Sequence, residues 1–159
     1  MISTHSDPFS VPTVAVFSGR LLPASETFIR AQAEGLTRFN SIYVGARRVS
    51  GLDLPSNRTK VVNQGGFFGK AQEYIFKQFG IAPLLLSQLR QTQPSLIHAH
   101  FGVCGALALP LSQSLKRPLI VTFHGFDACM TDDYAKKDSL STRLYLQRRE
   151  ALKQTTHTF

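Results

Sequence analysis

Two short segments of the chain combine residues that can do chemistry with residues that would expose them. His98 and His100 lie two residues apart and would share one face of a strand. His124 follows an apolar run and is itself followed by a glycine and, at Asp127, by a carboxylate. An imidazole donates or accepts a hydrogen bond near neutral pH, and a nearby carboxylate fixes its tautomer. These residues predict a site for a polar ligand.

The same histidines support a second hypothesis, in which they bind a metal. His-x-His is a familiar ligand spacing, and His124 or Asp127 would complete the set of a metal-dependent hydrolase. No Cys–His cluster or carboxylate-rich group strengthens this set in the sequence. For His98, which is deeper in its segment than His100, we expect an ordinary hydrogen-bonded imidazole. The chain is also too short for a (β/α)8 hydrolase barrel.

Strands and helices alternate along the chain. Short runs rich in β-branched and aromatic residues predict strands at 13–17, 41–44, 60–62, 96–101 and 118–124, with another beginning at 157. Helices are predicted from Ser25 to Leu36, from 70 to 90 with a division at Gly80 and Pro83, from 103 to 115 with a kink at Pro110, and from 132 to 154. The order predicts an α/β, Rossmann-like three-layer domain with a mainly parallel sheet.

In such a sheet the ligand binds beyond the carboxyl ends of the strands. Gly19 is expected in the turn after the first strand, and Ser25 is expected to cap a helix whose inner face is Phe28, Ile29, Gln32, Ala33 and Leu36. The start of that helix could receive a phosphate. The G-x-G-x-x-G fingerprint is absent, so NAD or FAD binding is not predicted. His100 and His124 end the fourth and fifth strands, so we expect one shared site.

The positive charge of the chain is concentrated in one third of its length. The 159 residues carry a formal net charge of +8, and the stretch from Arg38 to Arg90 holds eight basic residues and two acidic ones. A basic face can attract phosphates, nucleic acid or anionic lipid, or simply keep the protein in solution. No aromatic ribonucleoprotein motif or zinc finger occurs, so no nucleic-acid partner is predicted. A non-catalytic module that binds a phosphorylated glycan carrier or an acidic membrane through this stretch is a third hypothesis.

The aromatic stretch Phe67–Phe79 has two interpretations. It could be an amphipathic helix that faces a membrane. The row of Phe68, Ile75, Phe76 and Phe79 is equally typical of a helix that faces a protein core, and we favour the core.

The remaining features predict a cytoplasmic protein. Cys104 and Cys129 form no disulfide framework and are expected to be small, buried or half-buried residues in a reducing compartment. Residues 1–12 are polar, have no secretory signal and are expected to form a flexible segment. No apolar run approaches the roughly 20 residues of a spanning helix. Any membrane contact is therefore expected to be peripheral, on the cytoplasmic face.

Four segments, in order, resemble the N-terminal domain of GT-B glycosyltransferases of the retaining family 4 (group 1), the bacterial enzymes of exopolysaccharide, capsule or lipopolysaccharide synthesis. The segments are 25–29 with Gln32, 96–102, 118–127 and the strand start near Phe159. The resemblance covers nearly the whole chain. It implies a hexosyltransferase with two Rossmann-like domains, in which the N-terminal domain holds a glycan or lipid-linked acceptor. The C-terminal domain holds most of the nucleotide-sugar co-substrate, and no metal is expected.

The resemblance also implies roles for individual residues. Gly19 matches the glycine turn near the donor phosphates, and His124 matches the catalytic histidine beside the reacting sugar, with Asp127 next to it on the donor side. Glu26, Thr27 and His100 match the acceptor side.

The family's C-terminal domain, with its basic phosphate-binding pair and its Glu-x7-Glu motif, has no counterpart in these residues. The chain is therefore expected to be an acceptor-side domain over 13–159, truncated before the donor-binding domain. Sugar transfer requires stabilisation of the leaving diphosphate, so we expect this polypeptide alone to be inactive.

Overall fold

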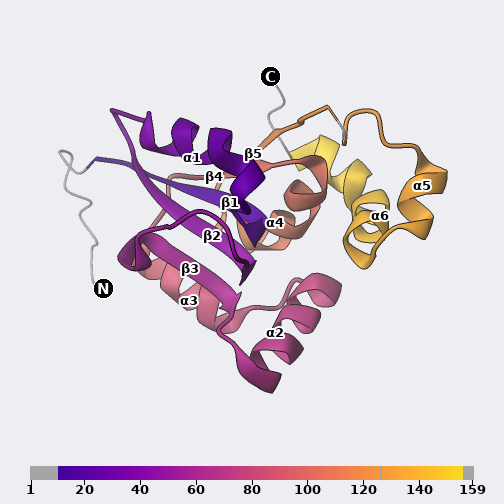
Figure 1. Ribbon diagram of the computed structural model, residues 1–159, viewed down its shortest axis with the longest axis horizontal. Coiled ribbons are helices and arrows are strands. Elements are labelled where there is room, and N and C mark those ends of the chain that lie inside the picture. The colour runs from indigo at the N-terminus through magenta and orange to yellow at the C-terminus, as the bar shows by residue number, and fades with distance from the viewer. Residues whose placement is uncertain (1–10, 126, 156–159) are drawn as a thin grey trace.

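The computed structural model describes residues 11–125 and 127–155 (Figure 1). Its strands are β1 (Thr13–Leu21), β2 (Asn40–Arg48), β3 (Thr59–Asn63), β4 (Leu96–His100) and β5 (Leu119–Thr122). Its helices are α1 (Thr27–Glu34), α2 (Gly66–Phe79), α3 (Pro83–Thr92), α4 (Gly102–Leu115), α5 (Asp132–Lys137) and α6 (Leu140–Thr155), with short 3₁₀ turns at Ala24–Glu26 and Ser56–Arg58. The strand predicted at 157 and most of the segment 1–12 lie outside the described residues.

The sheet is parallel throughout, as predicted, and its order is β3-β2-β1-β4-β5. The chain first builds outward from β1 to β3 and then crosses back to place β4 on the other side of β1. This reversal next to β1 is the topological switch point at which open α/β sheets bind ligands. The α/β, Rossmann-like prediction is confirmed.

Each face of the sheet has its own hydrophobic core because successive strand side chains point to opposite faces. Val14 and Val16 of β1 pack with Ile29 and Ala33 of α1 on one face. Ala15 and Phe17 pack on the other face, which is covered by α2, α3 and α4. Figure 1 shows α1 and α2 on opposite sides of the sheet. The arrangement is the predicted three-layer domain.

Helix α4 continues through Pro110, and Arg148 of α6 supplies the hydrogen-bond donor that the proline lacks. Proline has no N–H, so the carbonyl of Ala106, four residues earlier, lacks its helical donor. Arg148 of α6 replaces that donor, with its Nη1 3.0 Å from the Ala106 oxygen. Its Nη2 lies 3.1 Å from the carbonyl oxygen of Gln78, near the end of α2. One guanidinium thus joins α2, α4 and α6.

The single helix predicted over 132–154 is wrong, because the chain forms α5 and α6 instead. Ser139 and Thr142 cap the start of α6 reciprocally: the Ser139 N–H donates to Thr142 Oγ1 at 2.9 Å, and the Thr142 N–H donates to Ser139 Oγ at 3.3 Å. These bonds satisfy backbone donors at the start of a helix and so favour a new beginning there.

The start of the first helix also differs from the prediction. Strand β1 extends to Leu21, so Gly19 lies inside the strand and not in a turn. Ser25 does not cap the helix, because it lies within the 3₁₀ turn Ala24–Glu26 and α1 begins only at Thr27. Phe28 and Gln32 are exposed, because this two-turn helix buries only one row of i, i+4 contacts, Ile29 and Ala33.

The observed burial of side chains corrects two further predictions, one for the aromatic row on α2 and one for Cys129. Of the aromatic row predicted to face the core, only Phe76 is buried, while Phe68, Ile75 and Phe79 are exposed. Cys104 is buried as predicted, but Cys129 is exposed. Within residues 11–125 and 127–155, no helix has both the length and the apolar character needed to cross a membrane.

Candidate functional site

A cavity of about 690 Å³ opens at the carboxyl ends of β1, β2 and β4. Its volume is within the range typical of small-molecule sites. The end of β1 and the following turn form one wall, α2 and Arg47 form another, and the start of α4 forms the floor. The lining residues are Ser18, Gly19, Arg20, Glu26, Arg47, Lys70, Glu73, Tyr74, Lys77, Phe101, Val103, Cys104, Leu107, Asp127 and 138–141.

Glu26 is the carboxylate on the β1 side of the cavity. It ends the 3₁₀ turn that follows β1, and its Oε2 lies 3.2 Å from the hydroxyl of the buried Ser18. Burial raises the pKa of the Glu26 carboxyl, although the hydrogen bond from Ser18 and the charge of Arg20 oppose that rise. A carboxyl with a raised pKa can exchange a proton with a bound hydroxyl closer to neutral pH.

The α2 wall carries an ion-pair cluster. Glu73 accepts a hydrogen bond from Lys77 at 2.6 Å and another from Asn63 at 2.8 Å, and it lies 3.7 Å from Arg47. Burial by itself would raise the pKa of Glu73, but these three partners together lower it. Lys70, on the same wall, has no acidic partner among the described residues. This wall is therefore suited to an anionic group such as a phosphate.

The histidines form a connected group on the α1 face of the sheet. His98 Nε2 lies 2.8 Å from Thr122 Oγ1, which confirms the hydrogen-bonded imidazole expected there. His100 is buried, and its Nδ1 lies 3.0 Å from Nε2 of His124. Burial, with smaller effects of His98 and His124, lowers the pKa of His100 to about 3. His100 is thus neutral and holds the ring of His124.

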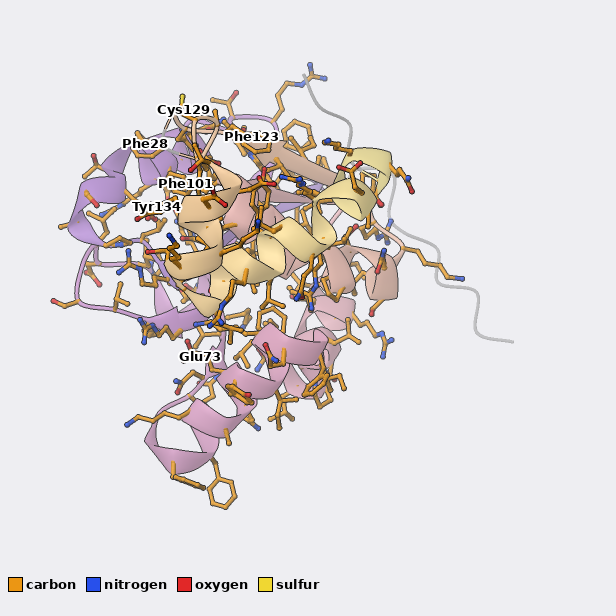
Figure 2. All side chains as sticks on the ribbon, turned by 90° about the vertical axis from the view of Figure 1, so that its right-hand side faces the viewer. Phe28, Glu73, Phe101, Phe123, Cys129 and Tyr134 are labelled. Atoms are coloured by element: carbon orange, nitrogen blue, oxygen red, sulfur yellow. The ribbon has the colours of Figure 1, made fainter. Side chains whose placement is uncertain are left out.

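His124 packs against two phenylalanine rings that also contact each other. The centroid of its ring is 4.8 Å from that of Phe28 on α1 and 4.8 Å from that of Phe101, which precedes α4. Figure 2 shows both phenylalanines at the same end of the molecule. Phe101 has a φ of +74°, which a residue with a side chain rarely adopts, and such strain is concentrated at functional sites. The segments after β1, β4 and β5 therefore meet, as the sequence predicted.

Asp127 holds the loop after β5 in place. It is buried, and its Oδ1 accepts the N–H of His124 at 2.8 Å. Its Oδ2 accepts the N–H of Gly102, the first residue of α4. A carboxylate is favoured there because backbone N–H groups and the helix dipole converge on a helix N-terminus. The geometry gives Asp127 a positioning role.

The predicted site residues divide into two groups. Gly19, Glu26 and Asp127 line the cavity. Among the described residues, His100, His124 and Thr27 do not line it. Thr27 is exposed at the start of α1, and His124 contacts two residues that do line the cavity, Phe101 and Asp127.

Gly19 lacks the expected turn, and its N–H donates to Cys104 Sγ at 3.2 Å. A Cβ at this position would lie 3.3 Å from Leu107, so the glycine lets α4 pack closely.

The sequence does not predict the individual residues of the α2 wall. Arg47, Glu73 and Lys77 lie far from the predicted motifs and meet only because β2 and α2 are neighbours. The one available signal was the excess of basic residues between Arg38 and Arg90.

The sequence matches Glycosyltransferase Family 4 over residues 25–159. The chain belongs to this family. The match confirms the resemblance to family 4 that the Ser25, Leu96 and Pro118 segments carry. Proteins of this family transfer sugars, so the family implies binding of an acceptor and of a sugar donor in general. No curated protein matches the chain significantly.

The alternative metal-ligand set is not assembled in this family 4 domain. Among residues 11–125 and 127–155, no three His, Cys, Asp or Glu side chains are grouped as metal ligands. The nitrogens of His100 and His124 face each other, and both oxygens of Asp127 accept backbone N–H groups.

The depressed pKa of His100 predicts how the stability of the family 4 domain depends on pH. The unfolded chain binds this proton near the usual histidine pKa of about 6.5, whereas the folded chain binds it only near 3. The contribution of neutral His100 to the unfolding free energy is complete above the histidine pKa of the unfolded chain, and it is lost progressively as the pH falls below that value. From pH 7 to 5, the wild-type protein should lose about 2 kcal/mol more unfolding free energy than His100→Gln. Urea unfolding at both pH values measures this, and equal losses in the two proteins would contradict it.

Proposed function

We propose that the chain is the acceptor-side domain of a retaining hexosyltransferase. In the complete enzyme, a sugar would pass from a nucleotide-sugar to a glycan or lipid-linked acceptor in exopolysaccharide, capsule or lipopolysaccharide synthesis. Family membership supports the transfer of a sugar. The observation that carries the acceptor assignment is the cavity at the switch point of the sheet, with the half-buried Glu26 in its wall.

The acceptor role is assigned to the β1 side of the cavity. Glu26 and Ser18 would bind an acceptor hydroxyl, and the raised pKa of Glu26 suits it to exchange a proton there. Thr27, which lies outside the cavity and is exposed at the start of α1, is proposed as a further acceptor contact. His100 would act on this side only indirectly, by fixing the ring of His124.

The donor role is assigned to the loop beyond β5 and to Gly19 in β1. His124 would orient the donor sugar by hydrogen bonding its hydroxyls, while Asp127 keeps the loop in place. Gly19, next to Arg20, would lie near the donor diphosphate. The phosphates themselves would be held mainly by the second domain of the complete enzyme. Lysine and arginine side chains can neutralise a leaving diphosphate, so no metal cofactor is proposed. The proposed location is the cytoplasm, with peripheral contact to the membrane.

The acceptor assignment predicts that Glu26→Gln weakens glycan binding. Losing one hydrogen bond between a glycan hydroxyl and the charged carboxylate of Glu26 should raise the Kd for the glycan about tenfold. The measurement is an NMR titration of the isotope-labelled chain with a panel of soluble oligosaccharides and, separately, with nucleotide-sugars. Amide shifts at Ser18, Glu26 and Phe101 are expected with an acceptor.

Glu150→Gln is the matched control, because Glu150 is exposed on α6 and away from the cavity. Binding unchanged by Glu26→Gln, or weakened equally by Glu150→Gln, would contradict the assignment. Tight binding of nucleotide-sugars by this chain alone would contradict the division of acceptor and donor between two domains.

A further inference from the structure

Helix α2 projects from the domain and carries an apolar face that no described element covers. Figures 1 and 2 both show it extending away from the sheet. Its inner row, Gly69, Glu73 and Phe76, is buried. Its outer row is exposed, with Phe67 and Phe68 82% accessible, Phe79 67%, Tyr74 59% and Ile75 41%. We call these five outer residues the aromatic face.

The aromatic face is one continuous surface. At 100° per residue, its five members occupy neighbouring positions on one side of α2, and Lys70 and Lys77 follow one edge of that side. Ile81 and Leu84, just beyond the helix, are exposed as well. Single exposed apolar residues are ordinary, but a contiguous aromatic patch marks an interaction site.

A basic pocket adjoins the exposed end of this face. It has a volume of about 450 Å³, and its charged lining residues are Arg47, Arg48 and Lys70. None of the described residues that line it is acidic. Gly65 and Gly66 form its edge and lead directly into Phe67, so the pocket and the most exposed rings are neighbours. The pocket is therefore complementary to an anion held next to an apolar surface.

We propose that the aromatic face and the basic pocket dock the protein on an anionic lipid bilayer. Phe67 and Phe68 enter the boundary between headgroups and acyl chains, and a lipid phosphate occupies the basic pocket. Aromatic rings on one side of a helix with lysines and arginines beside them are the combination that binds an anionic interface. A projecting helix end with two exposed rings is suited to enter a fluid surface.

Docking of this kind would place the candidate cavity at the bilayer surface. Arg47, Lys70 and Tyr74 belong both to the docking region and to the cavity wall. A lipid-linked acceptor could then reach Glu26 without leaving the membrane. The docking proposal itself depends only on this surface and not on the transfer reaction, so either can fail without the other.

Vesicle sedimentation tests the docking. The chain is mixed with vesicles of phosphatidylcholine alone, or of phosphatidylcholine with phosphatidylglycerol, over a series of NaCl concentrations. We expect binding only to the anionic vesicles, and less binding as salt rises. Phe67→Ser with Phe68→Ser should weaken binding at least about tenfold. Arg48→Gln with Lys70→Gln should weaken it about tenfold and reduce its dependence on salt.

Matched controls separate docking from misfolding. Phe39→Ser removes an exposed aromatic ring outside the aromatic face, and Arg90→Gln removes an exposed charge outside the basic pocket; both should bind like the wild-type protein. Circular dichroism verifies the fold of every variant. The proposal is overturned if the wild-type chain ignores anionic vesicles, if the double phenylalanine variant still binds fully, or if Phe39→Ser weakens binding equally. It is also overturned if gel filtration shows a dimer of the wild-type chain that the double phenylalanine variant does not form.

Discussion

His124→Ala should reduce the turnover of the complete glycosyltransferase at least about 100-fold while the domain remains folded. The imidazole is fixed by His100 at 3.0 Å and by the rings of Phe28 and Phe101. Alanine leaves the phenylalanine rings in place but removes the imidazole nitrogens that are proposed to hydrogen bond the sugar. The loss should fall on kcat more than on the KM for the acceptor, because the proposed contact orients the donor during transfer.

His98→Ala is the matched control for this experiment. It removes an imidazole from the same group, but one that bonds Thr122 and lies deeper along β4. Its turnover should stay within about threefold of the wild-type value, because no step of the transfer is assigned to it. Urea unfolding of both variants shows whether the fold is retained. Full turnover in His124→Ala, or an equal loss in His98→Ala, would remove His124 from the proposed site.

Gly45→Ala is expected to lower the unfolding free energy by about 3 kcal/mol. Gly45 lies in β2 opposite Ser18 of β1. A Cβ at this position would be 2.7 Å from the backbone oxygen of Ser18 and 3.3 Å from Leu21. A backbone oxygen inside a sheet cannot move aside as a flexible side chain can. The end of β1 would shift, and the hydroxyl of Ser18 would move relative to Glu26.

Gly19→Ala supplies the comparison in the neighbouring strand. The added methyl group there would meet the tip of Leu107 at 3.3 Å, which a small side-chain rotation relieves, and would lie in ordinary van der Waals contact with Cys104 Sγ at 3.7 Å. Its cost should stay below about 1 kcal/mol. Urea unfolding measures both variants, and NMR shifts at Ser18 and Glu26 report the displacement of β1. Similar stability losses in the two variants would show that close backbone approach is not what Gly45 provides.

The strands and their common edge could be predicted from the sequence because local patterns determine them. The β-branched runs around Val14, Ile97 and Ile120 mark buried strands, and the helices between them require parallel pairing. Parallel pairing in turn brings the residues that follow each strand to one edge. This is why Glu26, His100, His124 and Asp127 could be expected near one another before any distance was known.

Features that depend on pairs distant in the sequence could not be predicted. The break before α6 depends on the particular geometry of Ser139 and Thr142, and the polar pattern around them is equally compatible with one long helix. The cluster around Glu73 requires β2 and α2 to be neighbours. The row on α2 is likewise not predictable, because periodicity identifies an apolar face but not what covers it.

The two hydrogen bonds of the Arg148 guanidinium bear on how the helices of the domain can move. One planar guanidinium donates hydrogen bonds to carbonyl oxygens of both α2 and α4, so we expect a displacement of α6 to act on both of these helices. A lysine, with a single ammonium, could not hold two oxygens in fixed directions in this way. The three helices are therefore joined at one point, and we expect a displacement of α2 to be accompanied by displacements of α4 and α6.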